Sequence, residues 1–164
     1  MKKMTVRPAA KEDLSRIFEI YDIAKHFMWN NGNPTQWAPN YPAQEQLECD
    51  IAAGHLFVVT DDDQIHGVFA FILGDDPTYT IIEQGSWRSN SPYGTIHRIA
   101  SDGCGGILRI ALDYARTKAN HLRIDTHADN KPMQHLVEKY GFSKRGIIYT
   151  ATGSPRLAYD RLEA

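Results

Sequence analysis

The stretch from Ile96 to Asn130 limits the possible folds of this chain more than any other part of the sequence. It reads IHRIASDGCGGILRIALDYARTKANHLRIDTHADN. The pattern predicts a strand over Thr95–Ala100, a glycine-rich turn over Ser101–Gly106, a helix over Ile107–Ala119 and a second strand over Leu122–Thr126. Two strands joined by one helix form a parallel pair with a right-handed crossover.

The glycine-rich turn predicts an anion-binding site. Gly103, Gly105 and Gly106 stand directly before the predicted helix. The first amides of a helix have no partner within it, and they lie at the positive end of its dipole. Phosphate is the ligand that this arrangement favours. We therefore expect a nucleotide or a coenzyme, although the turn fits neither the GxGxxG nor the GxxxxGKS pattern.

Composition narrows the class of protein. The chain has 164 residues, of which 42% are hydrophobic and 23% charged, and this predicts one folded domain over residues 1–164. The apolar run Val68–Leu73 is too short to cross a bilayer, and the start MKKMTVRP lacks the apolar core of a signal peptide. The net charge is -2 and no large basic block occurs. We expect a cytoplasmic protein without membrane or nucleic-acid partners.

Cysteine and histidine spacing argues against a metal site. Cys49 and Cys104 form no CxxC pair, which favours a reducing compartment. The seven histidines include no HxH and no HExxH pattern, so we expect no metal. Cys104 stands at a helix N-terminus, where the pKa of a thiol can fall. Because a thiolate would repel a phosphate, we interpret Cys104 as a small residue of the turn.

Periodicity and turn residues predict the remaining elements. Before the glycine-rich turn we expect a strand over Thr5–Arg7, a helix from Leu14 to Met28, and a short helix around Leu47 and Ile51 that ends at Gly54. An antiparallel hairpin of His55–Thr60 and Ile65–Leu73 follows, and then a strand through Tyr79–Glu83 within an insertion over Thr78–Gly94. The chain ends with a helix from Asn130 to Tyr140 and strands over Phe142–Thr150 and Arg156–Arg161.

The segment from Trp29 to Pro42 reads WNNGNPTQWAPNYP and predicts a loop. One interpretation is a surface loop whose aromatic side chains pack at the edge of the core. The other is a loop beside the substrate, because large aromatic side chains are costly to expose unless they line a pocket.

The order of these elements resembles that of the GNAT superfamily of acetyl-CoA-dependent N-acetyltransferases. The resemblance covers nearly the whole chain. Three segments carry it: VRPAAKEDLSRIFEIY near the start, the turn and helix of Ser101–Ala119, and IDTHADNKPMQHLVEKYGF from Ile124 to Phe142. In the last segment Asn130 opens a helix that ends at Gly141. IHRIASDG together with RIDTHADN is also similar to small bacterial GNAT proteins of unassigned substrate.

The resemblance implies an α/β (α+β) fold with a mixed, mostly antiparallel sheet, a central βαβ unit and splayed strands that admit acetyl-CoA. Backbone groups of the strand before the turn would hold the pantetheine arm and the thioester. The turn and the helix N-terminus would hold the pyrophosphate. The cofactor-binding residues implied in this way are Arg98, Ile99, Ala100, Gly103, Cys104, Gly105, Gly106, Ile107, Leu108, Asn130 and Met133.

Two features depart from the family pattern. The family's turn has Gln or Arg, then Gly, then Gly or Ala, where this chain has Gly103, Gly106 and Leu108, so that one of three positions matches. Many relatives also carry a tyrosine that protonates the leaving thiolate, where this chain has Val137. Tyr140 follows nearly one helical turn later. It is either a packing residue or the acid, and solvent can also supply the proton.

Transfer to an amine also needs a group that removes a proton. The candidates for this catalytic role are Glu83 and His97, although each also fits a packed or solvated side chain. His127 shares a strand face with Asp125. This pair is either an aspartate-oriented base or part of the hydrogen bonding at the sheet edge.

The sequence leaves the acceptor open. An aromatic wall with Asp75, Asp76 and Glu83 as charge partners for an ammonium group fits a small amine, an amino acid or a peptide N-terminus. The substrate-binding residues that we expect are Trp29, Trp37, Tyr41 and His127.

We expect transfer of an acetyl group from acetyl-CoA to a primary amine by direct attack in a ternary complex. The alternative is a non-catalytic acyl-CoA-binding or sensing module on the same fold, and a third reading is a nucleotide-binding protein of unrelated fold. Many GNAT-like proteins pair through their final strands, so the resemblance also leaves a homodimer open.

Overall fold

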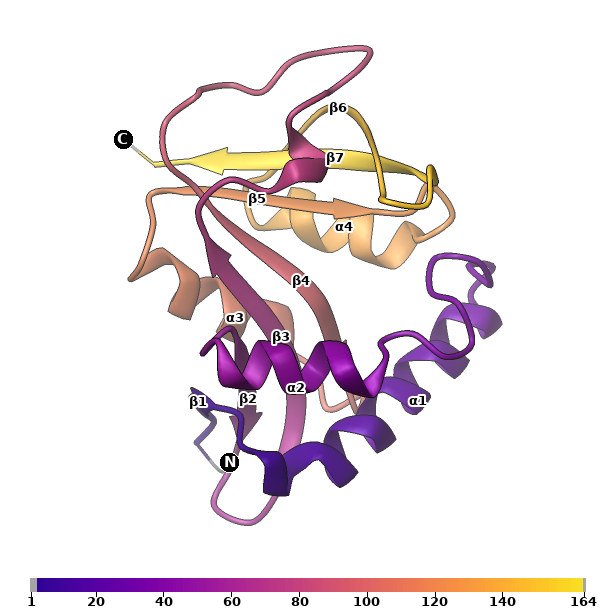
Figure 1. Cartoon of the computed structure of the whole chain (residues 1–164), viewed down its shortest axis with the longest axis vertical. Helices are drawn as coiled ribbons and strands as arrows, with labels where there is room; N and C mark the ends of the chain where they lie inside the picture. The colour runs from indigo at the N-terminus through magenta and orange to yellow at the C-terminus, as the bar shows by residue number, and fades with distance from the viewer. Residues whose placement is uncertain (1–2, 164) are drawn as a thin grey trace.

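The computed structural model describes residues 3–163, which form one sheet of seven strands in the order β1-β2-β3-β4-β5-β7-β6 (Figure 1). The strands are β1 (Thr5–Pro8), β2 (Leu56–Thr60), β3 (Ile65–Leu73), β4 (Gly94–Ser101), β5 (His121–Thr126), β6 (Ser143–Tyr149) and β7 (Pro155–Leu162). The helices are α1 (Leu14–Asn30), α2 (Gln44–Ala52), α3 (Ile107–Arg116) and α4 (Lys131–Lys139), with 3-10 turns at Lys11–Asp13 and Pro77–Tyr79. The predicted α/β fold with its mixed, mostly antiparallel sheet is confirmed.

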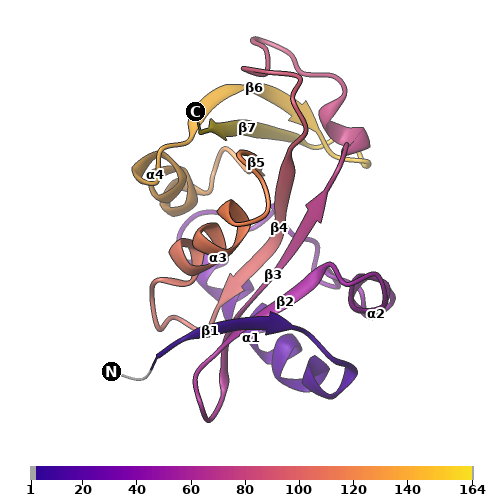
Figure 2. The ribbon, with the colours of Figure 1, turned by 90° about the vertical axis from the view of Figure 1, so that its left-hand side faces the viewer.

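Helices cover both faces of the sheet (Figure 2). On one face, α3 and α4 pack on a core that includes Phe69 and Ile96. On the other face, α1 and α2 pack on a second core that includes Val58 and Val68. Because β2 and β3 are buried on both faces, their residues form nearly continuous apolar runs instead of an alternating pattern.

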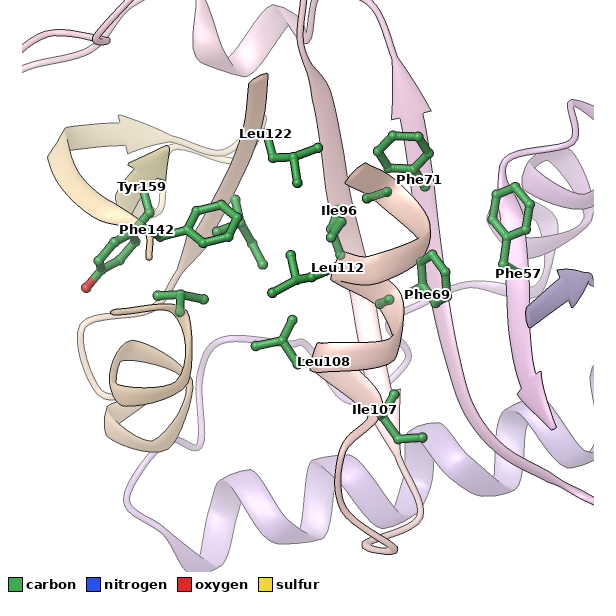
Figure 3. Close-up of a cluster of buried hydrophobic side chains, with 14 of the residues drawn as sticks. Phe57, Phe69, Phe71, Ile96, Ile107, Leu108, Leu112, Leu122, Phe142 and Tyr159 are labelled. Carbon is green, nitrogen blue, oxygen red and sulfur yellow. The ribbon is translucent and has the colours of Figure 1, made fainter. Parts of the chain in front are cut away.

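The helix α3 binds the two halves of the sheet together. Its side chains Leu108 and Leu112 are 6% and 2% exposed, and they project into the space between the strands (Figure 3). There they share one core with Leu122 of β5 and with Phe142, which follows α4. This face therefore stays closed by side chains where the strands themselves separate.

The strands β4 and β5 pair in parallel at their first residues and then diverge. Their register includes Gly94 with Leu122 and Thr95 with Arg123, and no later residue of β4 pairs with β5 in the described chain. Figure 1 shows β4 running away from β5 and the C-terminal strands. A β-bulge follows in β4, where Arg98 has a φ of 50°. The predicted βαβ unit and splayed strands are confirmed.

The predicted strand through Tyr79–Glu83 is wrong. The segment begins with a 3-10 turn that Asp76 caps by accepting a hydrogen bond from the Thr78 amide at 2.8 Å. Tyr79 is 1% exposed and packs with Tyr93 and Ile148 in a third core cluster. The insertion thus covers the outer face of the C-terminal strands, and tertiary packing overrides the local β propensity.

Two element ends also differ from the sequence prediction. Helix α1 continues to Asn30, so Trp29 belongs to a helix instead of the following loop. Helix α3 ends at Arg116, three residues before the predicted end at Ala119. In the described residues, every helix is too short or too polar to span a bilayer.

Candidate active site

The glycine-rich turn after β4 presents a row of free amides. Gly103, Gly105 and Gly106 have φ values of 97°, 85° and 78°, a left-handed conformation that glycine adopts without strain. Within residues 3–163, no acceptor engages the backbone amides of Gly105, Gly106, Ile107 and Leu108. These four amides open helix α3 and can bind an anion.

Asp102 fixes the shape of this turn. Its carboxylate accepts hydrogen bonds from His66 Nδ1 at 2.7 Å, Arg16 Nη2 at 3.0 Å and the Cys104 amide at 3.0 Å. His66 Nε2 donates to Asp61 at 2.8 Å. These bonds to Asp61 and Asp102 raise the pKa of His66, since both ring nitrogens donate to carboxylates in the charged form.

Cys104 is a residue of the turn, as predicted, and its thiol is not activated. Burial and then the charge of Asp102 raise the pKa of Cys104, so the neutral thiol is favoured. Cys104, His66 and Asp102 are close enough to share a metal ion. However, both nitrogens of His66 already lie on carboxylates, so the cluster fits hydrogen bonding better than metal ligation.

A cavity of about 340 Å³ lies next to the free amides, between α1, α3, α4 and the end of β4. Phe27 and Leu136, which are 54% and 37% exposed, stand on α1 and α4 where the two helices face each other across it. The predicted cofactor residues that line the cavity are Ile99, Ala100, Gly103, Gly105, Gly106, Ile107, Leu108, Asn130 and Met133. An apolar channel that meets unpaired amides fits the pantetheine arm and pyrophosphate of CoA.

Two predicted cofactor residues, Arg98 and Cys104, do not line this cavity. The guanidinium of Arg98 turns to α2, where Nη2 donates to Asp50 Oδ2 at 2.8 Å. Its carbonyl accepts a hydrogen bond from the Tyr21 hydroxyl at 2.7 Å. This bond holds α1 against β4.

Asn130 connects the cavity beside the free amides to the loop between α1 and α2. Its Oδ1 accepts a hydrogen bond from the Met133 amide at 3.2 Å and so caps α4. Its Nδ2 donates to Gln36 Oε1 at 2.9 Å. Gln36 Oε1 also accepts from Asn33 Nδ2 at 2.9 Å. The loop is held from the other side by Arg156, whose Nη2 donates to the Gln36 carbonyl at 2.7 Å.

His97 forms a dyad with Asp76 on the opposite side of the splay from α3. His97 Nε2 lies 2.7 Å from Asp76 Oδ2. Burial alone would raise the pKa of Asp76, but hydrogen bonds from His97 and Thr78 outweigh it and lower the pKa to about 2. An ionised Asp76 favours the tautomer with the proton on Nε2, which leaves Nδ1 as a proton acceptor. The predicted base candidate His97 thus has an orienting carboxylate.

Tyr79 and Asp125 form a second polar pair beside this dyad. The Tyr79 hydroxyl donates to Asp125 Oδ2 at 2.7 Å, and its ring centroid lies 6.1 Å from that of His97. Burial, reinforced by Asp125, raises the pKa of Tyr79 well above its ordinary value, so the hydroxyl remains a donor. Tyr79 could not be found from the sequence, because the strand predicted there would have given its side chain another direction.

The aromatic side chains of the predicted loop do not stay together. Trp37 and Tyr41 pack on each other with ring centroids 5.6 Å apart, and Trp37 also meets the Tyr21 ring at 5.6 Å. Trp29 is 53% exposed on α1 and its nearest ring is His26, at 6.0 Å. The structure therefore brings two of the three aromatic candidates to the side of the sheet that carries His97.

Two further predicted site residues, His127 and Glu83, lie apart from each other and from the dyad. His127 follows β5, where Nε2 lies 3.3 Å from Thr35 Oγ1 and Nδ1 accepts from the Asp129 amide at 3.0 Å. Of the two roles predicted for His127, the structure agrees with hydrogen bonding at the sheet edge, because Asp125 accepts its hydrogen bond from Tyr79 and does not orient His127. Glu83 is exposed and bonds the Tyr149 hydroxyl at 3.0 Å, outside the residues that line the cavity.

Tyr140 lines the coenzyme cavity and also packs against the core beside α3. Both alternatives drawn from the sequence, a packing residue and an acid near the leaving thiol, are compatible with this position. Val137 is 1% exposed and faces the same core, so the position where relatives carry tyrosine points inward here.

Comparison with known proteins agrees with this geometry. Residues 3–143 match the family model described as acetyltransferase (GNAT) domain. A GNAT-family acetyltransferase from Streptococcus agalactiae 2603 is 28% identical, with a TM-score of 0.86 over 98% of this chain and 96% of that chain. A GNAT-family acetyltransferase from Listeria monocytogenes 4b F2365 is 18% identical, with a TM-score of 0.70 over 98% of this chain and 95% of that chain.

A more distant structure, the NatC complex bound to Gag peptide and CoA, shares the fold at 14% identity and a TM-score of 0.54 over 99% of each chain. No curated protein matches the chain. The family match spans most of the sequence, from before β1 to the start of β6. The chain belongs to the GNAT family of acetyltransferases.

Proposed function

We propose that this protein transfers an acetyl group from acetyl-CoA to a primary amine, by direct attack of the amine in a ternary complex. The observation that carries the proposal is the splay of β4 from β5, with an apolar cavity and free amides on one side and the His97–Asp76 dyad on the other. The NatC structure, which was solved with CoA, supports the choice of coenzyme.

The turn and α3 supply the coenzyme site in this proposal. The amides from Gly105 to Leu108 would hold the pyrophosphate, and the residues of α1 and α4 around the cavity would hold the pantetheine arm. Acetyl-CoA itself supplies an activated acyl carbon as a thioester. The protein's contribution is mainly to position the two reactants and to keep water away from them.

His97 is the base in this proposal. Its Nδ1 would accept a proton from the amine, directly or through one water, while Asp76 stabilises the imidazolium that results. In the overall reaction a C–N bond forms, the C–S bond breaks, and CoA leaves as a thiol after taking up one proton. Tyr140 lines the cavity and can supply that proton, as can solvent.

The test of catalysis is release of CoA thiol from acetyl-CoA in the presence of a panel of amines. His97→Asn should reduce kcat by roughly a hundred- to ten-thousandfold, the usual size of a general-base contribution. The matched control is His26→Gln, because His26 is an exposed histidine that bonds only its own helix, at the Asp22 carbonyl. Equal rates for wild type and His97→Asn would remove His97 from the mechanism.

The test of the coenzyme site compares two glycines. Gly106 and Gly153 both have left-handed φ values, 78° and 85°, and an added Cβ meets nothing within 4 Å at either. Alanine should therefore strain both turns by a similar amount. Only Gly106→Ala should also weaken acetyl-CoA binding in calorimetry, because Gly153 lies in the β6–β7 turn. Equal affinity in the two variants would contradict the proposed pyrophosphate site.

A non-catalytic acyl-CoA-binding or sensing module is the second candidate. Two observations favour it: Val137 replaces the usual acid, and the glycine turn keeps one of the three family positions. Binding of acetyl-CoA without release of thiol for any amine would establish this alternative. A nucleotide-binding protein of unrelated fold is excluded by the family.

A further inference from the structure

Arg156 is a buried cation that no carboxylate of residues 3–163 contacts. It stands at the start of β7 and is 7% exposed. Within residues 3–163, no ion pair includes Arg156 and no aromatic ring stacks on its guanidinium. Burial of a charge is costly unless a counter-charge or a full set of hydrogen bonds compensates it.

Two other inward-turned arginines have a partner for their charge, although the Nε of Arg123 lacks a hydrogen-bond partner. Arg98 pairs with Asp50 at 2.8 Å. Arg123, which is 4% exposed, lies between the rings of Trp87 and Tyr93, 4.0 Å and 3.9 Å from their centroids. Arg156 differs from both, since neither a carboxylate nor an aromatic ring contacts its guanidinium in the described chain.

The hydrogen bonds of Arg156 go to neutral groups and leave donors free. Nη2 donates to the Gln36 carbonyl at 2.7 Å, and Nη1 donates to the Pro155 carbonyl at 3.0 Å and to Ser154 Oγ. A guanidinium has five N–H donors. These partners align Arg156 against the α1–α2 loop, and they supply no negative charge.

Arg156 faces the side of the sheet that carries the proposed base. In the β5–β7 ladder Thr126 pairs with Leu157 and Asp125 with Ala158, so Arg156 comes next beside His127, on the face of Asp125. Burial lowers the pKa of Arg156, while the charge of Asp125, which forms no ion pair with it, opposes this shift. Burial and then the charge of Arg156 lower the pKa of His127, which favours a neutral imidazole there.

We propose that the acceptor is a free amino acid, whose carboxylate binds Arg156 and whose amino group lies toward Asp125 and the His97–Asp76 dyad. The proposal rests on the proposed acetyl transfer and adds the class of acceptor. A carboxylate would supply a counter-charge in direct contact with Arg156 and use its free donors. Asp125 would attract the ammonium form, and His97 would remove its proton before attack. Simple amines and peptide N-termini lack a carboxylate next to the amine.

The experiment compares matched acceptors on the wild-type protein loaded with acetyl-CoA. Each free amino acid is tested beside its carboxamide and its decarboxylated amine, and thiol release is measured. We expect the best amino acid to exceed its carboxamide in kcat/KM by roughly ten- to a hundredfold, the usual effect of one charge-assisted bond in a buried site. The same amino acid should also raise the Tm of the CoA-bound protein, a readout that needs no turnover.

Variants separate recognition from folding. Arg156→Gln should reduce the preference for amino acid over carboxamide to nearly one, and Arg156→Lys should keep part of it. The control Arg116→Gln changes an exposed arginine at the end of α3, which pairs with Glu163 at 2.7 Å, and it should leave the preference unchanged. A purely structural Arg156 would lower the rate for both compounds and leave their ratio intact.

The outcomes distinguish the two proposals. Equal or better turnover of carboxamides and decarboxylated amines overturns amino-acid recognition and leaves acetyl transfer standing. Failure of acetyl-CoA to bind, or of every acceptor to release thiol, overturns the proposed transfer. If transfer fails but amino acids still raise the Tm in an Arg156-dependent way, recognition stands alone. If no amino acid raises the Tm, recognition fails as well.

Discussion

Replacing Asn130 tests the connection between the proposed coenzyme cavity and the α1–α2 loop. Asn130→Ala removes the cap of α4, which is worth about 1 kcal/mol, because Asn130 Oδ1 accepts the Met133 amide at 3.2 Å. It also removes the bond to Gln36 Oε1 at 2.9 Å, worth about 1 kcal/mol more. Gln36 keeps Asn33 as a donor at 2.9 Å, so its oxygen is not left unpaired.

The free energy of unfolding should therefore fall by about 2 kcal/mol in Asn130→Ala. For a chain of this size that corresponds to a loss of about 4–8 °C in Tm. Asn130→Ser keeps a capping oxygen and loses the bond to Gln36, so it should cost about 1 kcal/mol. Urea denaturation of both variants, with Gln36→Ala and the double variants, completes a double-mutant cycle.

Two outcomes of this double-mutant cycle would contradict the assigned contacts of Asn130. If Asn130→Ser and Gln36→Ala add without coupling, the bond between them contributes nothing and the loop is held by other contacts. If Asn130→Ala unfolds at the wild-type urea concentration, the capping argument for α4 is refuted as well.

Two further predictions concern the core and the turn. Leu112→Ala should lower the free energy of unfolding by about 2–5 kcal/mol, because Leu112 is buried and only 2% exposed. The control Leu73→Ala changes a site that is 57% exposed, and it should alter the free energy of unfolding by less than about 0.5 kcal/mol. Equal urea midpoints for the two variants would contradict the assigned core. His66→Gln should destabilise the protein most near pH 6, because the pKa of His66 is raised in the folded state by Asp61 and Asp102. The stability that His66 contributes is fully present below its ordinary pKa of about 6.5 while both carboxylates stay ionised, and it is lost as pH rises through the pKa of the folded state. Urea titrations at about pH 6 to 9 measure the difference in the free energy of unfolding between wild type and His66→Gln. A difference that grows with pH would refute the hydrogen bonds from His66 to Asp61 and Asp102.

Most elements could be predicted because local patterns determine them. The run from Ile107 to Ala115 has a helical apolar stripe that tertiary packing reinforces, and Gly141 has the left-handed φ of 93° that a helix stop requires. The family resemblance places Asn130 at the opening of a helix, and its side chain caps α4. In these cases the local preference and the final fold agree.

The contacts of Gln36, Arg156 and Tyr79 could not be predicted, because these residues meet partners that are far away in the sequence. Gln36 and Arg156 meet across 120 residues of sequence, and Tyr21 reaches Arg98 across 77. Nothing in the neighbouring residues of Gln36 indicates an amide that joins the loop to α4. Tyr79 was misread for the opposite reason, since its β-rich neighbours obscured the burial that places it on Asp125.

The cavity beside the glycine-rich turn could be predicted only in part. The glycines stand before α3, as the sequence predicts. They are glycines because Gly103, Gly105 and Gly106 all have left-handed φ values, a reason that the sequence pattern does not show. The apolar residues of α1 that complete the cavity, Ile23 and Phe27, were not predicted to belong to it. Their helix is far from α3 in the sequence, and only the folded sheet brings the two together.

The most direct test of the account is the amide spectrum of the protein titrated with CoA, recorded by NMR with ¹⁵N labelling. We expect the largest chemical-shift changes on the amides of Gly105, Gly106, Ile107 and Leu108, which are free in the described structure, while the amide of Gly153 stays unchanged. CoA binding that leaves those four amides unshifted, or no binding at millimolar CoA, would contradict it.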